Sequence, residues 1–321
     1  MACNGKNPLK IDGGGDHYIT PIANMLVGFA KEDPGVTKML PVEIDVVEVC
    51  CEWGLIKYAT AKDRRTGDLI VIAFYFLLRV GEYTCSHRNS QPVYTKRTVN
   101  FRLCDVVFFK KDGEGRLRPL PARCNPQDRL TSNGATLRLT NQKNGWKNVC
   151  IHQQSNDRGN FNPVLVMARI VNELHSWNAP GDTFLSAFKN EKGAIQHVIK
   201  TDVTKMLKEA AAKREYPELR GIPLDRINTH SLRSGGANAL SLAGFSDYQI
   251  QKMGRWSKQV FKEYISDQLS NFTDGMSEKM SRSYNFVNIA AGAQEGEYGE
   301  CADVTIQTLN AEYPVVTDDD E

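Results

Sequence analysis

Apolar residues recur at helical spacing along most of this chain, and the pattern predicts a mainly α-helical fold. The segment 68–80 is apolar on nearly every side, so we expect a buried helix that carries Arg79 at its end. Thr229 is expected to cap a later helix at its start, and Gly244 is expected to end it. The predicted helices span residues 22–30, 42–53, 68–80, 162–177, 201–214, 229–243, 247–253 and 258–268.

Between residues 97 and 152 the apolar positions change to a period of two, which is typical of β-strands. Asn100-Phe101-Arg102-Leu103 and residues 135–140 both alternate in this way. Turn sequences separate the strands at Asp112-Gly113-Glu114-Gly115 and at Asn144-Gly145. We therefore predict an α+β fold, mainly α, in which one small antiparallel β-sheet is inserted among the helices.

The turn sequence Asp33-Pro34-Gly35 is expected to end any helix before it, so we interpret residues 31–40 as a linker. The predicted organisation is then a short N-terminal part, one main domain and a C-terminal segment. Their ranges are 1–40, 41–275 and 276–321. The acidic end of the last segment is expected to be disordered.

The formal net charge of +2 hides an uneven distribution along the chain. Nine acidic residues follow Arg282 and no Lys or Arg does, so residues 1–282 carry about +11. Such a charge attracts polyanions, of which nucleic acid is the commonest, although ordinary solvated surfaces are also often basic. Basic side chains that we expect near DNA phosphates are Lys62, Arg64, Arg65, Lys96, Arg97, Lys110, Lys111, Lys200, Lys205 and Lys208.

The eight cysteines form no C-x-x-C pair, and we expect reduced thiols. The Cys-x-His sequences at 85–87 and 150–152 do not have the usual zinc spacing, so no metal site is predicted. The chain has no G-x-x-x-x-G-K-[ST] phosphate-binding loop, and we expect no cofactor. No apolar run is long enough for a signal peptide or a membrane span, which predicts an intracellular protein with no membrane partner.

The segment Thr229-His230-Ser231-Leu232-Arg233 places His230 and Arg233 on one face of a predicted helix, near its positive N-terminal end. This arrangement suits an anion, although a surface ion pair would also explain it. Downstream, Trp256 follows Gly254-Arg255, and Tyr264 lies in the predicted helix 258–268. Each aromatic residue taken alone would fit the core of a short amphipathic helix.

Taken together and in order, four features resemble the catalytic pattern of the tyrosine recombinase (phage integrase) superfamily. They are Arg79 in Leu-Leu-Arg-Val-Gly-Glu, His230-x-x-Arg233, Trp256 in Gly-Arg-Trp-Ser, and Tyr264. The resemblance covers about residues 41–268. The sequence motifs Gln142-Lys143-Asn144-Gly145 and Gly-Arg-Trp-Ser are similar to those of recombinases of Crypton-type mobile elements.

The resemblance implies the tyrosine recombinase catalytic fold and an enzyme that cleaves and rejoins DNA through a covalent 3′-phosphotyrosine bond. Tyr264 would be the nucleophile, and the reaction would need neither metal ions nor ATP. Arg79 and Arg233 would stabilise the charge on the phosphate, which guanidinium groups do bidentately.

The remaining roles also follow from the resemblance. His230 would take the proton of the nucleophile, and Lys143 would protonate the leaving oxygen, with Lys147 as the alternative. Trp256 would donate a hydrogen bond to a phosphate oxygen, and Glu82 would orient the site.

The family also implies double-stranded DNA as partner and a homo-oligomer on DNA, a tetramer of two dimers. Residues 1–40 would be the remnant of a helical core-binding domain, and the C-terminal segment would reach a neighbouring subunit. The protein would be nuclear in a eukaryote and cytoplasmic otherwise. Two alternatives stay open: a domesticated DNA-binding protein without catalysis, and a type IB topoisomerase.

Overall fold

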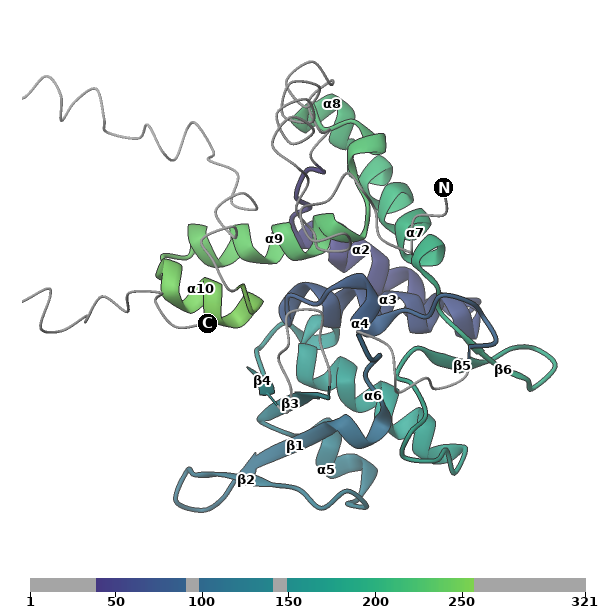
Figure 1. Ribbon diagram of the computed structural model, residues 1–321, viewed down its shortest axis with the longest axis vertical. Helices are drawn as coiled ribbons and strands as arrows, with labels where there is room; N and C mark the ends of the chain where they lie inside the picture. The colour runs from purple at the N-terminus through teal and green to yellow at the C-terminus, as the bar shows by residue number, and fades with distance from the viewer. Residues whose placement is uncertain (1–38, 91–97, 141–148, 257–321) are drawn as a thin grey trace, which may run out of the picture. The chain divides into compact units, whose positions relative to one another are not determined.

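Helices make up most of this computed structural model, which describes residues 39–90, 98–140 and 149–256 (Figure 1). The helices are α2 (Ile44–Leu55), α3 (Ala61–Tyr75), α4 (Val80–Tyr83), α5 (Pro126–Leu130), α6 (Pro163–Ser176), α7 (Lys200–Lys213), α8 (Tyr216–Arg220), α9 (Thr229–Leu242) and α10 (Asp247–Gly254). Within these ranges no helix is long and apolar enough to cross a membrane. The predictions for helices 22–30 and 258–268, for most of the linker and for the C-terminal segment lie outside the described residues.

The predicted antiparallel sheet is confirmed. Its strands are β1 (Val106–Lys111), β2 (Leu117–Pro119), β3 (Gly134–Leu139) and β4 (Val149–Gln154), in the order β2-β1-β3-β4. Leu137 of β3 is opposite Val106 of β1 and Ile151 of β4. Helix α6 packs against β3 and β4, which buries the central strand.

Some parts of the sheet region differ from the prediction. Residues 100–103 are not a strand, because Arg102 bonds to the Asp105 carboxylate at the start of a short 3-10 helix and makes only an isolated bridge to Phe184. Helix α5 and a second sheet of β5 (Ala187–Lys189) and β6 (Ile195–His197) were not predicted. These elements are too short for a periodic pattern to reveal.

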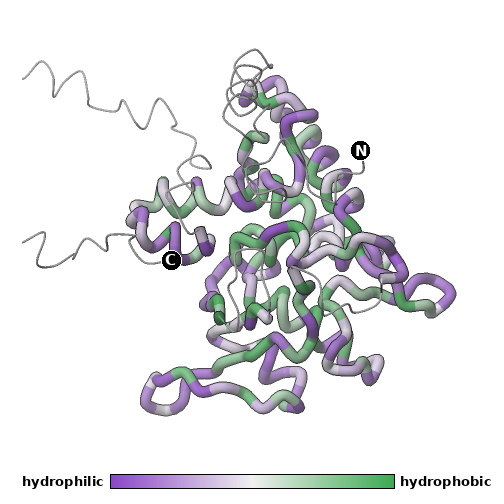
Figure 2. Tube along the Cα trace, viewed as in Figure 1, coloured by the Kyte–Doolittle hydropathy of each residue, from purple (hydrophilic) through white to green (hydrophobic). Residues whose placement is uncertain are grey.

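Helix α3 is the centre of the core, in contact with α2, α6, α7 and α9. Its residues from Arg65 to Phe74 are all buried. Figure 2 shows the opposite character at the tips of the β1–β2 and β5–β6 hairpins, which are hydrophilic. The apolar residues of the helices therefore face one another, and the hairpins extend into solvent.

The predicted helix 68–80 is wrong at both ends. Helix α3 begins at Ala61, where the Thr60 side chain accepts a hydrogen bond from Asp63 N at 3.1 Å. The first turns of α3 are polar in sequence, so its start was not predicted. Arg65 in these turns is nevertheless only 1% exposed, and its guanidinium pairs with the Glu173 carboxylate at 2.7 Å. This burial also corrects the expectation that Arg65 contacts DNA.

The same helix ends at Tyr75, and the chain then turns through Leu77, whose φ is +48°. A bulky residue in this left-handed region interrupts a helix. Arg79 is therefore not at the end of α3. It is the residue that precedes the first turn of α4.

The residue that caps helix α9 lies one position before the predicted cap. The side chain of Asn228, not Thr229, accepts a hydrogen bond from His230 N at 2.7 Å. Asparagine caps helices at least as well as threonine, and Asn228 has the extended backbone that a cap needs. Gly244 follows the end of this helix with a φ of +82°, as predicted.

Two adjacent glycines let α9 approach the neighbouring backbone closely. A Cβ at Gly235 would overlap the Val42 carbonyl oxygen and lie 3.2 Å from Phe74 Cε2. A Cβ at Gly236 would lie 2.6 Å from the Phe74 carbonyl oxygen. Helix α9 is thus fixed between the segment that leads into α2 and the end of α3.

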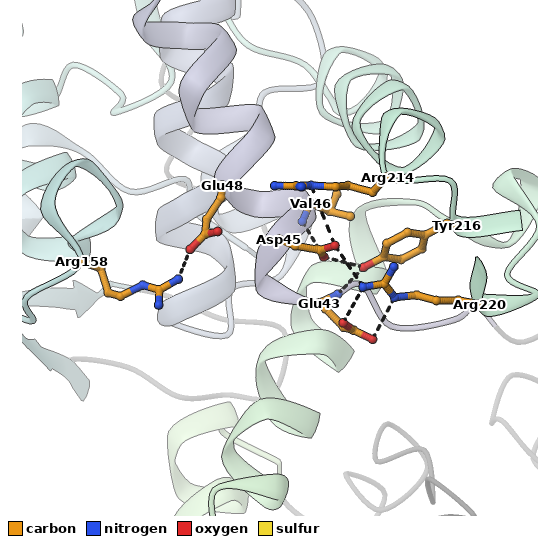
Figure 3. A network of polar contacts seen from close by, with 8 residues as sticks. All are labelled: Glu43, Asp45, Val46, Glu48, Arg158, Arg214, Tyr216 and Arg220. Carbon is orange, nitrogen blue, oxygen red and sulfur yellow. Dashed lines mark hydrogen bonds and ion pairs between the residues drawn. The ribbon is translucent and has the colours of Figure 1, made fainter. Parts of the chain in front are cut away.

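Polar contacts hold the start of α2 against α8 (Figure 3). Tyr216 is buried and donates to Asp45 Oδ1 at 2.9 Å, while Arg220 binds both Glu43 oxygens and Asp45. Burial raises the pKa of the Tyr216 phenol, which therefore stays protonated as a donor. Figure 3 also shows Glu48, one turn further along α2, paired with Arg158.

Replacing Gly235 by alanine should lower the free energy of unfolding by about 1–3 kcal/mol, because the added methyl group overfills this contact. Chemical denaturation measures the change. Gly81→Ala is the matched control, since a Cβ there meets only Thr98 Cγ2 at 3.7 Å and alanine is the better helix former. Equal stability of the two variants would contradict the tight fit at α9.

Candidate functional site

The turn between α3 and α4 places one arginine above a buried carboxylate. Arg79 N donates to Glu82 Oε2 at 2.9 Å, and Arg79 Nη1 donates to Glu82 Oε1 at 3.4 Å. The Glu82 side chain is fully buried, whereas that of Arg79 is 23% exposed. Arg79 is thus a cation at the surface whose backbone and side chain are both held by Glu82.

A second arginine reaches the same carboxylate from the end of α10. Arg255 Nη2 donates to Glu82 Oε2 at 2.7 Å and to the Leu77 carbonyl at 3.3 Å. Burial is the main cause that lowers the pKa of Arg255; the charge of Arg79 also lowers it, and that of Glu82 raises it. Sequence reasoning missed this residue, because no period or spacing distinguishes it from a surface arginine beside Trp256.

Arg233 enters the cluster from α9 and is buried. It donates hydrogen bonds to the carbonyl oxygens of Leu77 and Gly254. Its guanidinium carbon lies 4.3 Å from the centre of the Trp256 ring, within range of a cation–π contact. The ring packs in a small apolar cluster with Leu77, Ala237 and Ile250.

These contacts bring Arg79, Glu82, Arg233 and Trp256 together, although they are far apart in the sequence. Arg79 Nη2 donates to the carbonyl oxygen of Arg255 at 3.4 Å, next to the Gly254 carbonyl that Arg233 binds. The turn after α3, the first turns of α9 and the end of α10 therefore meet at one point. Two guanidinium groups near a helix N-terminus suit the binding of an anion such as a phosphate.

His230 lies in the first turn of α9 and is exposed to solvent. Neighbouring protein atoms shield part of the ring from water, and this desolvation is the main cause that lowers its pKa. The positive charges of Lys200 and Arg233 lower the pKa further. A lowered pKa means that the ring is neutral at neutral pH and can accept a proton.

Three residues expected to react lie outside the described residues: Tyr264, Lys143 and its alternative Lys147. On either side of the two lysines, β3 and β4 are paired, with Leu139 opposite Val149. The roles of all three stay predictions.

The described part of the chain has no group of three or more His, Cys, Asp or Glu side chains placed to hold a metal ion. None of its cysteines forms a disulfide.

No protein-family model matches this chain, and no curated protein matches it. Similar solved structures include the XerH site-specific recombinase bound to difH substrate, with 13% identity, a TM-score of 0.44, and coverage of 78% of this chain and 56% of that chain. The Tn1549 transposon integrase in complex with circular intermediate DNA has 14% identity, a TM-score of 0.37, and coverage of 78% and 69%. The XerA recombinase has 14% identity, a TM-score of 0.40, and coverage of 78% and 67%. The chain thus spans little more than half the length of the XerH chain, and likeness at this level concerns the fold alone.

Lys200→Gln should raise the pKa of His230 towards its ordinary value of 6.5, because it removes one nearby positive charge. Titration of the histidine ring signals by NMR measures this, with the His230 signal assigned from a His230→Gln variant. Lys192→Gln is the control, since this exposed lysine is not among the groups that act on His230. An equal midpoint in Lys200→Gln and the unaltered protein would contradict the electrostatic contact.

Proposed function

We propose that this protein is a tyrosine recombinase that cuts and rejoins double-stranded DNA through a covalent bond to Tyr264. The observation that carries the proposal is the meeting of Arg79 and Arg233 in one cluster with Glu82 and Trp256. Chance Arg and His-x-x-Arg sequences would have no reason to converge in this way.

The arrangement fits the requirement of phosphoryl transfer. Negative charge spreads over the phosphate oxygens in the transition state, and fixed cations aimed at these oxygens supply most of the catalysis. Guanidinium groups keep their charge at any physiological pH and can donate two parallel hydrogen bonds. Arg79, at the solvent edge, and Arg233, stacked on the Trp256 ring, are cations of this kind.

In the proposed step, the Tyr264 oxygen attacks the scissile phosphorus, and the bond from phosphorus to the 5′ oxygen breaks. The phenolic proton passes to His230, whose lowered pKa favours the neutral form that can take it. Lys143, or Lys147, protonates the departing 5′ oxygen. The energy of the broken phosphodiester is kept in the 3′-phosphotyrosine, so that the reverse attack by a 5′ hydroxyl can rejoin DNA without ATP or metal ions.

Glu82 and Trp256 are proposed to act on the arginines. Glu82 holds the Arg79 backbone and side chain, which agrees with an orienting role. Trp256 is 7% exposed and supports the Arg233 guanidinium with its ring. Its hydrogen bond to a phosphate oxygen stays a prediction.

The finer points of the proposal rest on the sequence resemblance. They are a Crypton-type origin, a tetramer of two dimers on DNA, the division of the chain into the parts 1–40, 41–275 and 276–321, and a location inside the cell, nuclear in a eukaryote.

Among the lysines expected near DNA, Lys110 pairs with Asp128 at 2.8 Å, and Lys205 pairs with Glu209 at 3.8 Å. Such exposed pairs are weak, so both remain able to exchange their partner for a phosphate.

The unaltered protein should form a denaturant-stable adduct with a nicked DNA substrate, from which the short cleaved strand diffuses away. Tyr264→Phe should form none, because phenylalanine has no oxygen to attack phosphorus. Denaturing gel electrophoresis of labelled DNA measures the adduct. The control is Tyr248→Phe, which alters a tyrosine that is 67% exposed.

Other outcomes would identify the alternatives. An adduct that persists in Tyr264→Phe would refute this nucleophile. Salt-sensitive DNA binding without any adduct would indicate a non-catalytic DNA-binding protein. Relaxation of supercoiled plasmid at no specific site would indicate a topoisomerase instead.

A further inference from the structure

The end of α10 has an unfavourable backbone conformation beside the two site arginines. Arg255 has a φ of +58°, in the left-handed region that favours glycine. Leu77, which accepts a hydrogen bond from Arg255 Nη2 at 3.3 Å, has a φ of +48°. Such conformations persist where surrounding contacts hold them, and they concentrate at functional sites. Two strained residues bonded to each other therefore point to a function for this contact.

The Arg255 side chain docks the end of α10 on the turn after α3. Its guanidinium is 1% exposed and donates to Glu82 Oε2 at 2.7 Å and to the Phe76 carbonyl at 3.3 Å. Together with the bond to Leu77, these partners belong to the segment that carries Arg79. One buried side chain thus fixes the backbone of α10 relative to Arg79.

The backbone at the same place binds both site arginines. Arg79 Nη2 donates to the Arg255 carbonyl at 3.4 Å, and Arg233 Nη2 donates to the Gly254 carbonyl. Gly254 has no room for a side chain, because a Cβ there would overlap the ring of Trp256. Two consecutive carbonyl groups therefore hold the two guanidinium groups, and the docked Arg255 side chain sets where these carbonyls lie.

We infer that Arg255 is a positioning residue that arranges the guanidinium groups of Arg79 and Arg233 into one binding site for the scissile phosphate. It acts through its own backbone and through Glu82, and its buried side chain does not touch the substrate. The inference rests on the proposed function, which supplies the phosphate. No such role follows from the sequence resemblance.

Arg65 is a matched comparison for Arg255. Its guanidinium is equally buried, and it also donates to a carbonyl oxygen, that of Leu185, and to a carboxylate, that of Glu173, both at 2.7 Å. In both arginines Nε lacks a partner within the described residues. The hydrogen bonds of Arg65, however, lead to α6 and to the segment before β5, away from the cluster.

The experiment compares Arg255→Lys and Arg65→Lys in the full chain with two nicked DNA substrates. One has an ordinary scissile phosphodiester, and the other has a methylphosphonate there, which lacks the negative charge that the arginines stabilise. Arg255→Lys should slow adduct formation on the phosphodiester by about 100-fold, the effect of displacing catalytic groups by about 1 Å. On the methylphosphonate the loss should shrink to less than about tenfold, because less charge needs stabilisation.

Arg65→Lys should lower the melting temperature but change both substrates by the same factor. Should Arg255→Lys fail to fold, Arg255→Gln keeps an amide donor for the Glu82 carboxylate, which Arg79 still pairs with, and the same difference between substrates is expected of it. A loss that is equal on the two substrates, in whichever of these variants folds, would overturn the positioning role.

Binding of inorganic phosphate, measured by calorimetry, separates this inference from the proposed function. A protein that binds phosphate but forms no adduct on either substrate would refute the function alone. Arg255→Lys should bind phosphate about tenfold more weakly, as expected when a displaced Arg79 or Arg233 loses one charge-assisted hydrogen bond to the phosphate. Arg65→Lys should bind phosphate as tightly as the unaltered protein. Unchanged phosphate affinity in Arg255→Lys, or no phosphate binding by the unaltered protein, would refute the inference.

Discussion

The buried carboxylate of Glu82 is the charge on which the cluster depends. Arg79 and Arg255 both bind it, and without it their like charges would repel inside a region largely shielded from water. A buried charge of either sign is unfavourable unless it is paired and hydrogen-bonded. Backbone carbonyl groups supply further acceptors, those of Phe76, Leu77, Gly254 and Arg255. The helices that contribute these groups are held together by that electrostatic balance as well as by their apolar faces.

Much of the fold could be predicted from the periodicity of apolar residues. Helices α6, α7, α9 and α10 and the pairing of β3 with β4 were found because each has one apolar face whose period is visible locally. Helix α3 was misplaced because its first turns are polar, and only the distant partners Leu185 and Glu173 make burial of Arg65 tolerable. The left-handed turn at Leu77 leaves no local signal either, since no glycine or asparagine marks it.

For the site, the sequence resemblance identified Arg79, Glu82, Arg233 and Trp256, and the structure places them together. The contacts of Arg255 could not be predicted, because only the folded chain brings its side chain against Glu82 and the Leu77 carbonyl. The ring of Trp256 packs against Arg233 and apolar neighbours, and its predicted hydrogen bond to a phosphate oxygen is not tested by this packing. The type of a residue suggests which interactions its side chain can make, and its packing in the folded chain shows with which neighbours it makes them.

The paired glycines of α9 also limit how the helix can move. Advancing an α-helix by one residue turns it by about 100°, since one turn takes about 3.6 residues. After such a shift in one direction, Ser234 would replace Gly235 against the Val42 carbonyl, where no Cβ fits. In the other direction, Ala237 would replace Gly236 against the Phe74 carbonyl, where a Cβ does not fit either. The rotational register of α9 is therefore fixed, and Arg233 cannot leave the cluster by a screw motion of its helix.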